Sequence, residues 1–251
     1  MSVDPQKKDH YSYEHYRSEQ VAEGFDALRF GGPIGQLVQD AQEVLLMQAF
    51  GPIRERTILD VGTGTGRAAL ALARAGAVVV GVDASEEMLA VARRAADERK
   101  LSAIFQVGDA HSLPFADREF ECAVSLRVIM HTPNWQQCVA ELCRVATWRV
   151  VVDFPSARSA AALESRSRQQ RQARGEKVEA YRTLAVADVR AAIERAGFRV
   201  IGVHKQFVLP INFHKLFNSP MFTNAVESTL ATFGVLNLFG SPVTITAERV
   251  K

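Results

Sequence analysis

Three glycines alternate with threonines directly after a short apolar run, at Gly62, Gly64 and Gly66. A glycine lets the backbone approach a ligand where any Cβ would clash, and the N-terminus of a following helix adds oriented N–H groups. The loop therefore predicts a binding site for a nucleotide-like ligand. A dinucleotide fingerprint needs the spacing G-x-G-x-x-G, but Arg67 stands where its third glycine belongs. This spacing disfavours an NAD-dependent oxidoreductase, which stays an alternative.

Three acidic side chains stand at the ends of apolar runs and are candidates to bind the same ligand. Asp60 precedes the glycine loop, Asp83 ends the next apolar run, and Asp109 follows the third. Each also has a structural interpretation, because Asp83 and Asp109 can cap helices and Asp60 can accept bonds from N–H groups of the loop.

A second candidate pair, Arg127 and His131, follows the fourth apolar run. The ordinary pKa of histidine suits proton removal near neutral pH, which makes His131 the best candidate for a general base. The alternative is a histidine that hydrogen-bonds backbone at the approach to a helix. Arg127 can clamp an anionic group of a substrate, or it can pair with Glu141 or Asp153. These two residues are the predicted catalytic residues.

No pattern of histidines or cysteines predicts a metal site. His10, His15 and His111 have no partners in the sequence that would distinguish them from surface histidines, and no pair has the spacing of metal ligands. The three cysteines are odd in number and form no C-x-x-C pair. We therefore expect packed thiols in a reducing compartment.

Short apolar runs alternate with helix-like segments along most of the chain. The predicted strands are 57–61, 77–82, 103–107, 121–126, 149–153, 198–204 and 243–247. The predicted helices are 36–50, 67–74, 86–100, 135–145 and 186–196. Strands separated by helices form right-handed βαβ units and a mainly parallel sheet. The sequence thus predicts an α/β, Rossmann-like sheet of seven strands with helices on both faces, and its ligand lies at the carboxyl ends of the strands.

Some segments do not fit this alternation. Residues 1–50 are expected to form an N-terminal helical cap on a domain at 51–251. Within that domain, 155–182 is interpreted as a basic helical insertion, and 207–240 as an apolar insertion that holds six of the 14 phenylalanines. Both insertions are expected beside the ligand cleft.

The segment from Leu59 to Gly66, together with Asp83 and Asp109, resembles the cofactor motifs of the class I S-adenosylmethionine-dependent methyltransferases. The resemblance covers about 57–153, although the family usually has Asp where this chain has Glu121. It implies that Asp83 binds both ribose hydroxyls of S-adenosylmethionine, that Asp109 takes the adenine amino group, and that the next backbone N–H meets the ring. The implied cofactor-binding residues are Asp60, Gly62, Thr63, Gly64, Gly66, Asp83, Ala84, Met88, Asp109, Ala110 and Ser125.

The resemblance also implies a reaction, in which the methyl group of a sulfonium passes to a nucleophile. The donor is already activated, so the protein mainly positions the reactants and excludes water. Leu126-Arg127-Val128-Ile129 stands where the family's adenine and glutamine amino-group methylases carry D/N-P-P-Y/F. The plan is most similar to the methyltransferases of ubiquinone and menaquinone biosynthesis, which implies transfer to an oxygen or carbon of a small metabolite, with a lipophilic acceptor as one option. A module that binds S-adenosylmethionine without turnover is the alternative.

Two aromatic segments bear on partners of the protein. Tyr11, Tyr13 and Tyr16, with the segment 25–30, resemble lid helices over the cofactor, or they only pack the cap. The segment 207–240 must bury its apolar face against the core, in a homodimer, on a membrane surface or around a lipophilic acceptor.

Composition excludes several classes of protein. The chain has 251 residues, of which 47% are hydrophobic and 23% charged, with a net charge of +2. These values exclude global disorder and give no reason to expect nucleic acid as a partner. Residues 1–10 are too polar for a signal peptide, and no run of eighteen apolar residues occurs. We therefore expect a cytoplasmic protein.

Overall fold

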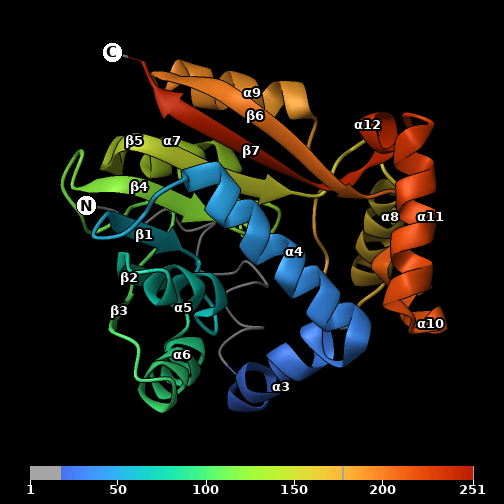
Figure 1. Ribbon diagram of the computed structural model, residues 1–251, viewed down its shortest axis with the longest axis horizontal. Helices are drawn as coiled ribbons and strands as arrows, with labels where there is room; N and C mark the ends of the chain where they lie inside the picture. Colours follow the sequence, from blue (N-terminus) through green and yellow to red (C-terminus); the bar gives the residue numbers. More distant parts are fainter. Residues whose placement is uncertain (1–17, 177, 251) are drawn as a thin grey trace.

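A single seven-stranded sheet organises the computed structural model, which describes residues 18–176 and 178–250 (Figure 1). The strands are β1 (Thr57–Val61), β2 (Val78–Asp83), β3 (Ala103–Val107), β4 (Phe120–Ser125), β5 (Ala146–Phe154), β6 (Phe198–Phe207) and β7 (Ser241–Arg249). Their order is β3-β2-β1-β4-β5-β7-β6. Strands β1 to β5 pair in parallel, and β7 runs antiparallel to both β5 and β6. The predicted mostly parallel, Rossmann-like sheet is confirmed.

Helices cover both faces of this sheet, as the βαβ pattern predicts. The helices are α3 (Glu19–Phe30), α4 (Gly32–Phe50), α5 (Arg67–Arg74), α6 (Glu86–Glu98), α7 (Trp135–Val145), α8 (Ala161–Ala173), α9 (Val186–Arg195), α10 (Ile211–Phe217), α11 (Pro220–Thr232) and α12 (Val235–Phe239). One apolar core lies between the sheet and helices α7 and α9. The other lies between the sheet and helices α4, α5 and α6.

The central strands are apolar without interruption because both of their faces are buried. Along β5, Val150 and Val152 join the core under α7 and α9, and Val151 between them joins the core under α4 to α6. Successive strand side chains point to opposite faces, so a strand covered on both sides shows no polar alternation. The same reason explains the buried, free thiols: Cys122 lies on β4, and burial raises its pKa to about 12.

The order of the strands reverses between β1 and β4, and this reversal creates a crevice. β1 pairs with β2 on one side and with β4 on the other, so the chain leaves the carboxyl ends of β1 and β4 in different directions. Ligands of open α/β sheets bind in a crevice of this kind. The ends of β1, β2 and β4 are also where the sequence places its candidate residues.

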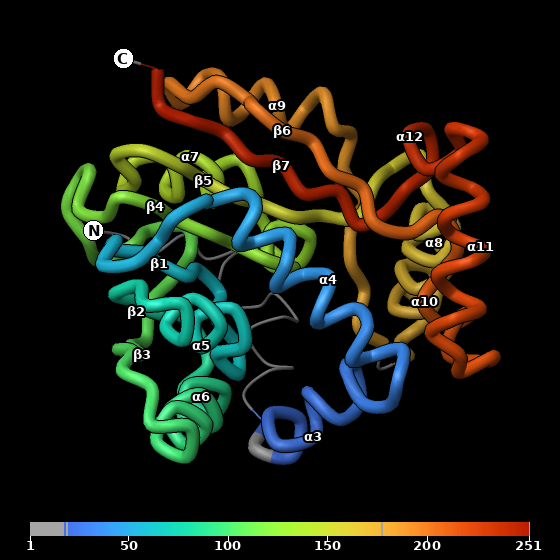
Figure 2. Tube along the Cα trace, in the orientation of Figure 1, coloured from blue at the N-terminus to red at the C-terminus, as the bar shows by residue number. Residues whose placement is uncertain are grey.

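Helices α3 and α4 form the described part of the N-terminal segment. The two helices are separated at Gly31, whose N–H still donates to the Ala27 carbonyl. Pro33 occupies the first turn of α4. Figure 2 shows that these N-terminal helices lie close to α10, which belongs to the C-terminal part of the sequence. The Lys215 ammonium on α10 donates to the carbonyls of Leu28 and Arg29, both at 3.1 Å. Tyr11, Tyr13, Tyr16, His10 and His15 lie outside the described residues.

The apolar segment 207–240 contains helices α10, α11 and α12, and only part of it packs inward. Phe207 and His214 are buried, whereas Leu216, Met221 and Phe233 are about four-fifths exposed. The Glu227 carboxylate on α11 accepts hydrogen bonds from the N–H groups of Val208 and Leu209 and contacts His214 Nε2 at 2.8 Å. This buried pair fixes the segment that leaves β6. In residues 18–176 and 178–250, no helix is long and apolar enough to span a bilayer.

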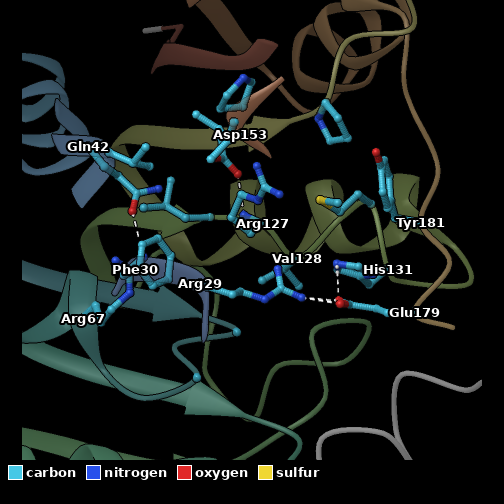
Figure 3. Close-up of a pocket in the computed structure, with 18 of the residues that line it drawn as sticks. Arg29, Phe30, Gln42, Arg67, Arg127, Val128, His131, Asp153, Glu179 and Tyr181 are labelled. Carbon is cyan, nitrogen blue, oxygen red and sulfur yellow. Dashed lines mark hydrogen bonds and ion pairs between the residues drawn. The ribbon is translucent and has the colours of Figure 1, made fainter. Parts of the chain in front are cut away.

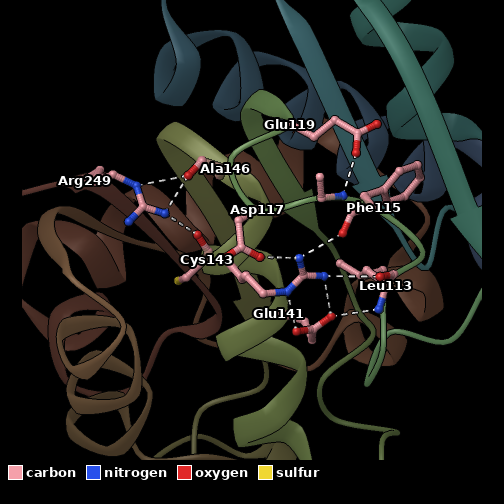
Figure 4. A network of polar contacts seen from close by, with 10 residues as sticks. Leu113, Phe115, Asp117, Glu119, Glu141, Cys143, Ala146 and Arg249 are labelled. Atoms are coloured by element: carbon pink, nitrogen blue, oxygen red, sulfur yellow. Dashed lines mark hydrogen bonds and ion pairs between the residues drawn. The ribbon is translucent and has the colours of Figure 1, made fainter.

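Two arginines tie the end of α7 to its neighbours (Figure 4). Arg144 pairs with Glu141 and Asp117 and donates to the carbonyls of Leu113 and Phe115. Arg249 on β7 donates to the carbonyls of Cys143 and Ala146, which satisfies acceptors that the last turn of a helix leaves open. The loop before β4 and the last strand are thereby fixed to one helix end.

The difference in burial predicts that the same change, phenylalanine to alanine, has different effects on stability at two positions. Phe154 at the end of β5 is fully buried, and Phe233 after α11 is exposed. Removing a buried phenylalanine side chain costs about 3–5 kcal/mol, whereas an exposed change stays within about 0.5 kcal/mol. Denaturant unfolding should therefore separate Phe154→Ala strongly from Phe233→Ala. Equal losses of unfolding free energy would contradict this description of the core.

Candidate functional site

A cavity of about 640 Å³ opens at the carboxyl ends of β1, β2 and β4. Its floor is the glycine loop and the loop after β4. Helices α3 and α4 form one wall, and α8 with the segments 179–181 and 206–212 forms another. The candidate residues from separate parts of the sequence therefore face one shared space.

The glycine loop needs glycine at particular positions. Gly62, Gly64 and Gly66 all have positive φ, at 72°, 55° and 80°, a conformation that costs other residues energy. A Cβ on Gly62 would lie 2.2 Å from Val128 Cγ2 in the loop after β4. A Cβ on Gly64 would meet no atom of the described residues within 4 Å. Gly62 thus lets two loops meet, and Gly64 leaves open space on the cavity side.

Asp83 connects the ends of two neighbouring strands. Its carboxylate accepts the Gly64 N–H at 2.8 Å and the Ser85 N–H at 3.0 Å. Burial raises its pKa above the ordinary range, and these hydrogen bonds oppose the rise. The Ala84 N–H adds a third such bond, and since a carboxylate has about four acceptor sites, capacity for a ligand remains. Both expectations for Asp83, local bonding and ligand contact, are therefore compatible.

Asp60 is bonded within the loop. Its Oδ2 accepts the Thr63 hydroxyl at 2.7 Å and the Ala69 N–H at 3.2 Å. Burial raises the pKa of Asp60 to about 6, and both hydrogen bonds counteract that rise. These contacts support the structural interpretation of this carboxylate, which also forms part of the cavity wall.

The residues implied by the resemblance divide into two groups. The ones on the cavity wall are Asp60, Gly62, Thr63, Gly64, Asp83, Ala84, Met88 and Ala110. Gly66, Asp109 and Ser125 do not line the cavity. A Cβ on Gly66 would press against Ala92 and Phe105, and the Ser125 hydroxyl donates to the Val61 carbonyl at 2.9 Å. Gly66 and Ser125 thus pack behind the residues that form the floor of the cavity.

Asp109 and His111 correct an expectation from the sequence. The Asp109 Oδ1 contacts His111 Nδ1 at 2.7 Å and accepts the His111 N–H at 2.8 Å. His111 is buried, so its assignment as a surface histidine is wrong. A polar residue is buried where it has hydrogen-bond partners, and here the partner is two residues away in sequence. The bond holds the backbone of Gly108 and Ala110, which do line the cavity.

His131 lies on the cavity wall beside an acidic residue that sequence reasoning missed. Its Nε2 lies 3.3 Å from Glu179 Oε1, and Glu179 also pairs with Arg29 of α3 (Figure 3). Burial lowers the pKa of His131 to about 4, a shift that Glu179 only partly offsets. The expectation of an ordinary histidine pKa is therefore wrong. The ring is neutral at pH 7 and a weaker base than an exposed histidine.

Arg127 lies next to Asp153, one of its two predicted partners, and its charge opposes the rise that burial causes in the pKa of that carboxyl. Its backbone N–H donates to the buried carboxylate of Asp153, and the two residues appear together in Figure 3. Glu141 is engaged by Arg144 and by the Leu113 N–H, so pairing with Glu141 is wrong. The Arg127 guanidinium forms no hydrogen bond or ion pair with the described residues.

Helix α3 lies along the cavity and has polar contacts to both of its sides. Asp26 accepts the Thr65 hydroxyl of the glycine loop at 2.9 Å, and Arg29 pairs with Glu179 beside His131. Arg67 stacks on the Phe30 ring and donates to Gln42 of α4 at 3.0 Å. The predicted aromatic segment 25–30 is thus a helix over the cavity. No cluster of three metal-binding side chains occurs in the part of the chain that the structure describes.

Sequence comparisons match the centre of the chain. A family model described as a methyltransferase domain matches residues 59–147. The demethylmenaquinone methyltransferase of Thermus thermophilus is 39% identical over 105 residues, which cover 40% of this chain and 48% of that protein. The uncharacterized methyltransferase YcgJ of Bacillus subtilis is 34% identical over 134 residues, or 53% of this chain and 47% of that protein. The chain spans about a third to a half of the curated relatives it matches.

Structural comparisons extend over more of the chain. Magnesium protoporphyrin IX methyltransferase from Synechocystis, solved with bound SAH (S-adenosylhomocysteine), has a TM-score of 0.67 and 16% identity, and the match covers 96% of this chain and 98% of that one. The cyclase SpnF has a TM-score of 0.59 and 21% identity, over 84% of this chain and 80% of that one. At such identities the likeness establishes the fold alone, and these two proteins are named for different reactions.

The lowered pKa of His131 predicts a dependence of stability on pH. Between about pH 4 and 6.5 the unfolded chain binds a proton that the folded ring excludes, so His131 makes stability rise with pH across this window. A pKa lowered from 6.5 to about 4 corresponds to roughly 3 kcal/mol. Asp60, whose pKa is raised, makes stability fall with pH in the same window. The measurement therefore compares the free energy of denaturant unfolding of wild type with that of His131→Gln from pH 4.5 to 7, so that the contribution of Asp60 cancels. The difference should grow as pH rises; a constant difference contradicts the assignment.

Proposed function

We propose that this protein transfers a methyl group from S-adenosylmethionine to a small molecule, because residues 59–147 match a family model described as a methyltransferase domain and the fold is similar to that of a methyltransferase solved with bound SAH. In that reaction a lone pair of the acceptor attacks the methyl carbon. The carbon–sulfur bond breaks, its electron pair stays on sulfur, and S-adenosylhomocysteine leaves. An acceptor hydroxyl or acidic C–H also loses one proton.

The observation that carries this proposal is the pairing of the open glycine loop with Asp83. The Gly64 N–H is held on the Asp83 carboxylate, and no atom of residues 18–176 or 178–250 occupies the space where a Gly64 side chain would stand. This cradle fits a ligand that brings hydroxyl groups close to backbone. In our proposal Asp83 binds the ribose, and Met88 and Ala110 on the same wall border the adenine.

The other half of the cavity is proposed to hold the acceptor. Its wall combines apolar groups from Leu126, Met130, Leu209 and Ile211 with the ring of Tyr181. Such a wall suits a lipophilic metabolite with a nucleophilic oxygen or carbon. The relatives named for demethylmenaquinone and for magnesium protoporphyrin IX support an acceptor of this kind.

The role of His131 is proposed as accepting the acceptor's proton. Its neutral ring can accept a proton at pH 7, and the nearby Glu179 would stabilise the imidazolium that forms. The lowered pKa suits an acceptor that is itself acidic, such as a phenol or an activated C–H, because the proton transfer then needs less basicity.

Partner contact through 207–240 stays a proposal as well. The exposed side chains of Leu216, Phe217 and Met221 at the junction of α10 and α11 form an apolar surface that a second copy or a membrane surface would cover.

A methyl-transfer assay tests the proposed function and its alternative. Protein is incubated with S-adenosylmethionine carrying a labelled methyl group and with a small-molecule extract, and labelled products are identified by mass. Methylated product is expected. Donor binding by calorimetry without any labelled product would support the alternative, a module without turnover, which stays relevant because the cyclase SpnF shares this fold. Binding of NAD in place of the donor would contradict both.

Asp83 provides a quantitative prediction for donor binding. Hydrogen bonds to charged groups contribute about 1.5–3 kcal/mol each, so Asp83→Ala should weaken S-adenosylhomocysteine binding at least about tenfold. Asp97→Ala, an exposed change on α6, is the matched control and should bind as wild type. Titration calorimetry gives both constants, and thermal melting checks that the fold persists. Unchanged affinity in Asp83→Ala would remove the donor site from this wall.

A further inference from the structure

Five lysine and arginine side chains reach the cavity wall, and four of them are engaged by protein groups. Arg29 pairs with Glu179, Arg67 donates to Gln42, Arg168 pairs with Glu164, and Lys215 donates to two carbonyls of α3. Arg127 is the exception among the described wall residues, because its guanidinium has no hydrogen bond or ion pair. A guanidinium carries five donors and is always charged, so this group has unused capacity directed at a ligand.

The backbone of Arg127 is held in an unusual conformation. Its φ is +62°, which is uncommon outside glycine and costs energy that surrounding structure must offset. The Asp153 carboxylate accepts the Arg127 N–H and fixes this conformation. Because Asp153 is 1% exposed, its anchor is rigid. The Asp153 carboxylate thus holds the Arg127 backbone and also interacts with the charge of its guanidinium, while the N–H donors of that guanidinium form no hydrogen bond with the described residues and line the cavity.

The surroundings of Arg127 indicate what kind of anion it would bind. Leu126, Val128 and Met130 flank it on the wall, with Pro155 and Tyr181 further along the cavity; Figure 3 shows Arg127 next to Asp153 and on the side of the cavity that Tyr181 borders. A guanidinium whose N–H donors are unused can bind a carboxylate through two parallel hydrogen bonds. A phosphate dianion would bring a second charge for which the described wall has no free cation.

We infer that Arg127 binds a carboxylate of the methyl acceptor, so that the substrate class is an apolar molecule with one carboxylic acid group. The inference deepens the proposed function and rests on it, because it assumes that the half of the cavity next to Arg127 holds the acceptor. The carboxylate anchors the molecule at Arg127, and its apolar body lies along Met130, Tyr181 and Leu209. Arg127 is then a specificity-determining residue that contacts the substrate.

The experiment uses a matched pair of probes that differ only in charge, naphthalene-2-carboxylate and naphthalene-2-carboxamide. Each is titrated at pH 7.5 into protein saturated with S-adenosylhomocysteine, with affinity read by calorimetry or ligand-observed NMR. The carboxylate should bind at least about tenfold more tightly, as expected for a charge-assisted pair. Arg127→Gln should bring the two probes to equal affinity, and Arg127→Lys should keep only part of the difference.

Two controls separate this inference from other effects. Arg166→Gln removes an exposed arginine of α8 that does not line the cavity, and it should keep the wild-type preference. Binding of S-adenosylhomocysteine to Arg127→Gln should match wild type, and its melting temperature shows that it folds.

The outcomes that overturn the inference are equal affinities in wild type, no binding of either probe, or a preference that survives in Arg127→Gln. If wild type does not bind S-adenosylhomocysteine, the proposed function fails, and the probe pair is then titrated into the free protein. The two failures are thereby distinguished.

Discussion

The site depends on a close approach of two loops that only a glycine permits. At Gly62 the chain turns out of β1 and passes so near Val128 that a Cβ would lie 2.2 Å from its Cγ2. This contact sets the width of the crevice where the strand order reverses, between β1 and β4. On one side it fixes the loop whose Gly64 N–H meets Asp83. On the other side it positions the segment that carries Arg127 and His131. A single steric constraint thereby places the proposed donor and acceptor halves against each other.

Burial shifts the pKa values of the polar groups around this crevice away from their values in water. It raises the pKa of Asp60 to about 6 and lowers that of His131 to about 4, since a low dielectric disfavours the charged form. The fold offsets these costs with local partners: Asp60 has Thr63 and Ala69, and Asp153 has the Arg127 backbone. Such groups are rigid because each has a fixed bond. In the proposed function, these carboxylates would lie close to the positively charged sulfonium, with the acceptor beyond it.

The sequence predicts the framework of this protein well, and its long-range pairs poorly. Strands such as 57–61 are evident because residues buried on both faces form continuous apolar runs, and the glycine loop is evident because its spacing is local. Sequence reasoning misses Glu179, since a lone glutamate in a basic segment gives no signal that it meets Arg29, 150 positions earlier. It also misplaces His111, because that ring is buried against partners that include the Asp109 carboxylate and the Asn134 N–H, which lies 23 positions later. The pKa of His131 follows from packing by segments that are distant in sequence, which no local pattern indicates.

A crystal structure of the protein with S-adenosylhomocysteine would test the central claim most directly, because it locates the ligand relative to the two loops. The account predicts that the ribose hydroxyls lie on the Asp83 carboxylate and that the homocysteine part follows Gly62 and Gly64. The sulfur should then face the half of the cavity that Arg127 and His131 border. Ligand density elsewhere on the molecule, or an empty cavity in crystals grown at saturating S-adenosylhomocysteine, would contradict the account.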